Sequence, residues 1–92
     1  MKEIYIRKLS YIDAKNKLER EIQQAFVEGE TYVEVIHGIG EGILKRMVIE
    51  YVQSQSYLKL VERTSLVSSN PGATQIEILT PKKEILKKYL KL

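Results

Sequence analysis

The middle of the chain reads Val33-Glu34-Val35-Ile36-His37-Gly38-Ile39-Gly40-Glu41-Gly42, which is the pattern of a β-strand followed by a glycine-rich loop. Apolar and polar residues alternate up to Ile36 as they do in a β-strand, and an amphipathic helical pattern begins at Ile43. A strand that ends in glycines before a helix forms a loop whose backbone N–H groups point outward. The positive end of the helix dipole lies behind those groups. The stretch therefore predicts a phosphate-binding loop at Gly38, Gly40 and Gly42.

Other glycine-rich phosphate motifs do not fit this loop. A P-loop needs Gly-Lys followed by Ser or Thr, and that sequence is absent. A dinucleotide-binding fingerprint needs a third glycine where Ile43 stands, and the chain is too short for the fold that carries it. A tight strand-to-helix turn with no ligand is the structural alternative for the three glycines.

His37 stands at the mouth of the loop and has two interpretations. It is either a functional residue, as a phosphate ligand or a general acid, or a structural residue whose imidazole bonds loop carbonyls. One positioned acid supplies roughly 3–5 kcal/mol of the roughly 8–23 kcal/mol by which enzymes lower barriers. His37 alone therefore falls short of phosphodiester cleavage. The carboxylates that could assist it are Glu3, Glu34 and Glu41, and no pair of them has the spacing of metal ligands.

On both sides of the loop, the pattern of apolar residues predicts further elements, so that the chain has four strands and two long helices in the order βαβαββ. The strands are expected at residues 3–8, 31–36, 58–63 and 75–79. Ser10 and Asp13 form a helix-start signature, and Gly29 ends the stripe that follows. The second helix begins after the glycines. Its expected buried stripe is Ile43, Met47 and Tyr51.

The strand alternation predicts a two-layer α/β sandwich with a mixed four-stranded sheet, because a parallel sheet covered on both sides would be apolar throughout. Both helices are expected on one apolar face, formed by Ile4, Ile6, Val33, Val35, Leu58, Leu60, Ile76 and Ile78. The open face would carry Tyr5, Arg7, Tyr32, Glu34, Lys59, Gln75 and Glu77. We expect Tyr5 and Tyr32 to form a cross-strand pair there, or an interface. A right-handed crossover brings Arg7 and Lys8 toward His37.

The C-terminal residues differ from the rest in charge. The net charge is +3, but residues 82–92 hold five lysines and one acid, so residues 1–81 carry −1. The globular part, residues 1–80, must therefore use a local patch or the tail to attract nucleic acid. Thr80-Pro81 predicts the start of a basic amphipathic helix over residues 81–92. That helix would dock on the open face or on a partner, including a second copy.

Length and composition narrow the class of protein. Ninety-two residues allow one small core, and no cysteine is present for disulfides or thiolate metal sites. No apolar run approaches the roughly 18 residues that span a bilayer, so no membrane partner is expected. The segment after Lys2 and Glu3 is a short strand pattern rather than a signal peptide. A cytoplasmic location is the simplest expectation.

Residues 2–79 resemble the Smr (small MutS-related) domain, in particular the version at the C-terminus of type-two bacterial MutS proteins. The family motif Val-x-Val-Ile-His-Gly-x-Gly-x-Gly is met by residues 33–42, and Leu44-Lys45-Arg46 is similar to the Leu-Arg-Lys that follows it. The first family motif, Leu-Asp-Leu-Arg/His-Gly, is matched weakly by Ile4-Tyr5-Ile6-Arg7-Lys8. The resemblance implies a fold similar to the C-terminal domain of translation initiation factor three.

The resemblance also implies a function. Family members bind DNA or RNA, several nick it, and some act on branched DNA or have been linked to collided ribosomes. DNA repair, recombination or ribosome quality control is the expected setting. The expected phosphate-binding residues are Arg7, Lys8, His37, Gly38, Gly40, Gly42, Lys45 and Arg46, with His37 also the candidate catalytic residue.

Three departures from the family argue against cleavage. Tyr5 stands in place of the family aspartate, while Ile39 and Glu41 replace lysine and threonine; only Lys8, in place of glycine, adds a cation. We therefore expect binding of structured nucleic acid, with a nicking endonuclease as the hypothesis still to be tested. No resident cofactor or metal site is expected, and a divalent metal ion enters only with nuclease activity. The alternative function is an inactive protein-interaction or self-association module.

Overall fold

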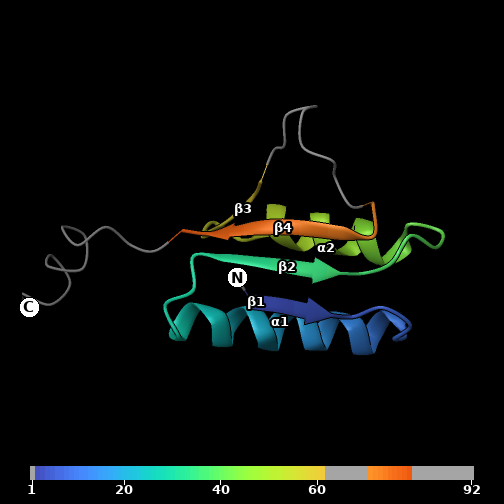
Figure 1. Cartoon of the computed structure of the whole chain (residues 1–92), viewed down its shortest axis with the longest axis horizontal. Helices are drawn as coiled ribbons and strands as arrows, with labels where there is room; N and C mark the ends of the chain where they lie inside the picture. Colours follow the sequence, from blue (N-terminus) through green and yellow to red (C-terminus); the bar gives the residue numbers. More distant parts are fainter. Residues whose placement is uncertain (1, 62–70, 80–92) are drawn as a thin grey trace, which may run out of the picture.

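The computed structural model describes residues 2–61 and 71–79 of the chain (Figure 1). Its elements follow the predicted order. They are β1 (Lys2–Tyr5), α1 (Tyr11–Val27), β2 (Tyr32–Ile36), α2 (Ile43–Ser54), β3 (Leu58–Leu60) and β4 (Ala73–Ile78). The predicted tail helix, residues 81–92, lies outside the described residues, as do Glu62 and Arg63 of the third predicted strand. Neither helix in the described part is long and apolar enough to cross a membrane.

The strands form one mixed sheet in the order β1-β2-β4-β3, which confirms the predicted fold. β1 and β2 are parallel, whereas β4 is antiparallel to both β2 and β3. The carboxyl ends of β1 and β2 therefore meet at one edge, where Tyr5 pairs with Ile36 and Ile36 pairs with Ala73. This edge lies beside the start of α2 (Figure 1).

The predicted signals at both ends of α1 are confirmed. The hydroxyl of Ser10 caps the helix by accepting a hydrogen bond from the Asp13 amide at 3.2 Å. Gly29 ends it with a φ of 81°, a left-handed conformation that side chains resist. Phe26, which has the helical spacing of the buried α1 residues, is 37% exposed and packs edge-on against Tyr57 at a centroid distance of 5.3 Å.

The core lies between the sheet and two helices on the same face. All the apolar strand residues predicted for this face are buried except Leu60, which is partly buried against the core. The helices contribute Ala14, Leu18, Ile22 and Ala25 from α1, and Met47, Val48, Tyr51 and Val52 from α2. Burial raises the pKa of the Tyr51 phenol well above its usual range. The prediction for Ile43 is wrong, because this first residue of α2 lies mostly exposed beside the glycine loop.

β1 is shorter than predicted, since it ends at Tyr5 rather than Lys8. The chain turns here because the amides of Ile6 and Arg7 both donate to the Ile36 carbonyl, at 3.0 and 3.1 Å. Lys8 then adopts a φ of 69°, as the only described residue other than glycine with a positive φ. The turn ends the strand pattern early and lifts Arg7 and Lys8 out of the sheet.

The open face holds tyrosines and carboxylates, but Tyr5 and Tyr32 do not form the expected cross-strand pair. Tyr5 pairs with Ile36 in the register, whereas Tyr32 lies at the opposite end of β2. Each phenol donates to a nearby carboxylate instead: Tyr5 to Glu3 at 3.2 Å and Tyr32 to Glu77 at 3.3 Å. Alternation predicts which face a residue occupies, but the separation along the face depends on the register.

Candidate functional site

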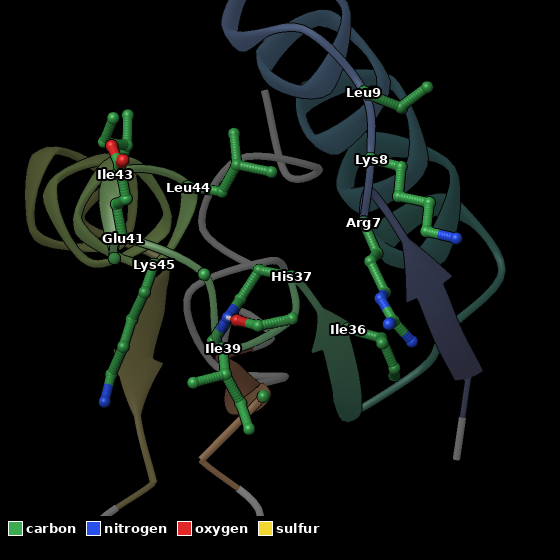
Figure 2. Close-up of a pocket in the computed structure, with 14 residues that line it drawn as sticks. Arg7, Lys8, Leu9, Ile36, His37, Ile39, Glu41, Ile43, Leu44 and Lys45 are labelled. Carbon is green, nitrogen blue, oxygen red and sulfur yellow. Dashed lines mark hydrogen bonds between the residues drawn. The ribbon is translucent and has the colours of Figure 1, made fainter.

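The loop between β2 and α2 borders a pocket of about 670 Å³ at the edge where β1 and β2 end (Figure 2). Three segments line it: the turn after β1 with Arg7, Lys8 and Leu9, the residues from Ile36 to Lys45, and Gly72 just before β4. The predicted convergence of the Arg7-Lys8 pair with the glycine loop is therefore confirmed. Arg46 is exposed on α2 and does not line the pocket, although the sequence places it with Lys45.

Left-handed backbone explains why the loop contains glycines. Gly38, Gly40 and Gly42 have φ angles of 79°, 35° and 82°. A side chain is disfavoured in this region because its Cβ crowds the following carbonyl. Gly42 is also the N-cap of α2 and supplies no side-chain cap, so the start of the helix is left open to an outside acceptor.

Most of the loop amides are without a partner, as the anion-site prediction requires. The first bond of α2 runs from the Arg46 amide to the Gly42 carbonyl at 2.9 Å. Within the described residues, the N–H groups of residues 39–45 donate no well-formed hydrogen bond, although residues 40–41 form a turn. The expectation fails for Gly38, because the amides of His37 and Gly38 both donate to the Gly72 carbonyl at 2.9 Å. The free donors thus begin one residue later than the sequence predicts.

Arg7 packs directly against the first glycine of the loop. A Cβ placed on Gly38 would lie 3.1 Å from the Arg7 Cγ and 3.6 Å from its Nε. The aliphatic part of Arg7 therefore uses the space that the absent side chain leaves, and its guanidinium is held at the pocket. In Figure 2, Arg7 and Lys45 flank the loop that carries His37. Gly38 consequently serves both the backbone turn and the placement of a cation.

The pocket has a local excess of positive charge. Arg7, Lys8 and Lys45 line it together with one carboxylate, Glu41. In the described part of the chain, ion pairs form only between Lys2 and the carboxylates of Glu21 and Glu28, so the three pocket cations are available to an anion. Lys8 occupies a left-handed position that costs roughly 1–2 kcal/mol relative to glycine. Lys8 therefore adds a cation to the pocket at a conformational cost.

His37 is buried beneath the loop, with 4% of its surface exposed. Its Nδ1 lies 2.8 Å from the Gly38 carbonyl oxygen, and its Nε2 lies 2.8 Å from the Thr74 hydroxyl. A carbonyl only accepts, so Nδ1 carries the proton, and in the neutral ring Nε2 accepts from Thr74. The ring therefore joins the loop to β4, because Nδ1 contacts the loop and Nε2 contacts the strand. This geometry favours the structural interpretation, while the general-acid role stays a prediction.

The carboxylates that might assist cleavage are not gathered at His37. Glu3 and Glu34 pair in the register on the open face, and Glu34 accepts from the Gln75 amide at 3.1 Å. The Tyr5 phenol, at the family's aspartate position, donates a hydrogen bond to Glu3, and this bond raises the pKa of the phenol. Only Glu41 reaches the pocket. Among residues 2–61 and 71–79, no three His, Cys, Asp or Glu side chains could share a metal ion.

The sequence patterns do not predict two residues that support the site. Thr74 holds the His37 ring, and Gly72 accepts from two loop amides. Gly72 belongs to a turn signal, Asn70-Pro71-Gly72, but nothing local indicates that its carbonyl faces the loop. Both contacts depend on the antiparallel pairing of β2 with β4, which spans more than thirty positions of sequence.

These features define a class of protein. It is a two-layer α/β domain with a glycine-rich, cation-flanked loop at the ends of two parallel strands. The family model for the Smr domain matches residues 4–78, and the chain belongs to this family. The sequence-based resemblance is therefore confirmed.

Similar proteins place the match within longer chains. The chain is 32% identical over 69 residues to endonuclease MutS2 of Streptococcus pneumoniae strain Hungary19A-6, and 29% identical over 69 residues to endonuclease MutS2 of Lactococcus lactis subsp. cremoris strain MG1363. Each match covers 75% of this chain and 9% of the relative. The Smr domain of Thermus thermophilus MutS2 shares the fold, with a TM-score of 0.76 at 18% identity, covering 87% of this chain and all of that one.

Proposed function

We propose that this domain binds nucleic acid by holding backbone phosphates in the pocket between Arg7, Lys8 and the glycine loop. The observation that carries the proposal is the convergence of unpartnered amides at residues 39–45 with three cations that form no ion pair in the described structure. Phosphate oxygens accept from such amides and from guanidinium groups. DNA and RNA share this backbone, so both are candidate ligands, in DNA repair, recombination or ribosome quality control.

The relatives support a nucleic-acid ligand, since the two MutS2 proteins are named endonucleases. This chain matches only 9% of their length, so their names support the class of ligand and not an activity of this chain. The pocket favours binding over cleavage. His37 has both ring nitrogens engaged, and Glu41 is the one carboxylate of the pocket lining.

The salt dependence of binding tests the proposal. For a protein that contacts Z phosphates of duplex DNA, log K falls against log salt with a slope near −0.9Z. An Arg7→Ala/Lys8→Ala variant should bind about tenfold more weakly and lose about 1.8 from the magnitude of that slope. Fluorescence anisotropy on one labelled duplex, at several salt concentrations, measures both quantities.

An Arg20→Ala/Lys59→Ala variant is the matched control, because it removes the same charge from exposed positions outside the pocket. It should keep the wild-type slope. Equal losses in both variants would mean a diffuse charge effect, and a wild-type slope of zero would favour the protein-interaction or self-association module.

A nicking assay on supercoiled plasmid with divalent metal tests cleavage. We expect the wild-type protein to relax no more plasmid than the Arg7→Ala/Lys8→Ala variant does. Additional nicks by the wild-type protein would restore the endonuclease hypothesis.

A further inference from the structure

Exposed apolar side chains stand beside the phosphate-binding loop. Ile39, at the tip of the loop, is 70% exposed, and Ile43, at the start of α2, is 56% exposed. Both line the same pocket as Arg7, with Leu9 and Leu44 adding further apolar surface. Single exposed apolar residues are ordinary on protein surfaces. A cluster of them that adjoins the charged side chains of a pocket indicates contact with a ligand. Neither isoleucine is needed for the core.

Such a cluster fits a ligand that is charged at one end and apolar at the other. The amides of residues 39–45 and Arg7 attract an anion, while Ile39 and Ile43 offer surface only to an apolar group. A nucleotide has this character, because its phosphate is anionic and the faces of its base are apolar. In a duplex those faces are stacked, and an apolar side chain reaches them only by unstacking a step at a cost of a few kcal/mol.

We propose that the pocket recognises an unpaired nucleotide, with its phosphate on the loop amides and its base against Ile39 and Ile43. This inference rests on the proposed function and specifies its substrate class. Unpaired bases splay away from the backbone and are open to side-chain contact, as in loops, strand ends and junctions. Figure 2 shows Ile39 on the loop between Lys45 and Arg7, where a base joined to a bound phosphate would meet it.

The test compares two single strands of about 12 nucleotides, a length within the range of known single-strand sites. One carries bases and the other has the same phosphodiester backbone with every base removed. Wild-type protein should bind the strand with bases about tenfold more tightly, which corresponds to ~1.4 kcal/mol. An Ile39→Ser/Ile43→Ser variant should bind both strands equally, at the wild-type affinity for the abasic one. Ile12→Ser is the control, since Ile12 is 69% exposed on α1 and outside the pocket.

The possible results of this experiment distinguish a failure of the base contact from a failure of phosphate binding. Equal wild-type binding of the two strands would overturn the base contact and leave phosphate binding intact. A preference that persists in the Ile39→Ser/Ile43→Ser variant would place the base elsewhere and would also overturn it. Failure of wild-type protein to bind either strand, or a duplex of the same sequence, would refute the proposed function itself. An isoleucine cluster that binds a protein partner would give the first or the third result.

Discussion

Replacing His37 with alanine is expected to lower the free energy of unfolding by about 3 kcal/mol, through a cavity and lost hydrogen bonds. The imidazole is buried, and its removal leaves the Gly38 carbonyl and the Thr74 hydroxyl without their partner. For a domain of this size, a change of 1 kcal/mol shifts the melting temperature by roughly 4–8 °C. Urea denaturation and thermal melting followed by circular dichroism measure the loss.

Thr74→Val provides the comparison for His37→Ala, because it removes one hydrogen bond and keeps the shape of the side chain. It should cost about 1 kcal/mol. The double variant His37→Ala/Thr74→Val should cost less than the sum of the two, since the same bond is lost in each. A His37→Ala protein that melts like wild type but no longer binds or nicks nucleic acid would contradict the structural role and support the ligand or general-acid role.

Gly38→Ala is expected to cost about 2 kcal/mol of stability and to weaken phosphate binding. Part of the cost is conformational, because an alanine at a φ of 79° is strained by roughly 1–2 kcal/mol. The remainder comes from the new methyl group, which would lie 3.1 Å from the Arg7 Cγ. Arg7 must shift by a few tenths of an ångström to relieve this contact, and the shift displaces its guanidinium at the pocket.

Gly29→Ala separates these two causes. Gly29 has a nearly equal φ of 81°, but no heavy atom lies within 4 Å of its added Cβ, and it does not line the pocket. Its variant should lose about 1–2 kcal/mol from strain alone and keep wild-type affinity for DNA. Melting curves and anisotropy titrations of the two variants provide the comparison. Undiminished binding by Gly38→Ala would show that Arg7 does not depend on this glycine.

Much of the fold is readable from local signals. Ser10 and Gly29 bound α1 as expected, since a cap and a left-handed stop act within a few residues. The alternation in β2 and its glycines predicts the loop, and the crossover rule brings Arg7 and Lys8 to it. These inferences hold because each depends on neighbours in sequence or on a general rule of handedness.

The features that the sequence did not predict depend on contacts between distant parts of the chain. Ile43 matches the helical period, yet it is mostly exposed at the first residue of α2, where it lines the pocket beside the glycine loop. The register separates Tyr5 from Tyr32, and alternation alone carries no information about register. The bond from Thr74 to His37 and the use of the Gly38 amide by Gly72 arise from pairing between distant strands. Local patterns do not contain such contacts.

An NMR titration shows whether backbone amides of the glycine loop hold a phosphate beside Arg7, as the proposed function requires. Amide shifts of the uniformly ¹⁵N-labelled chain are followed as a short single-stranded oligonucleotide is added. We expect the largest changes at residues 39–45 and at Arg7 and Lys8, with the open-face strand residues nearly unmoved. Changes confined to the open face around Tyr32 and Glu77, with the loop amides unaffected, would contradict the claim.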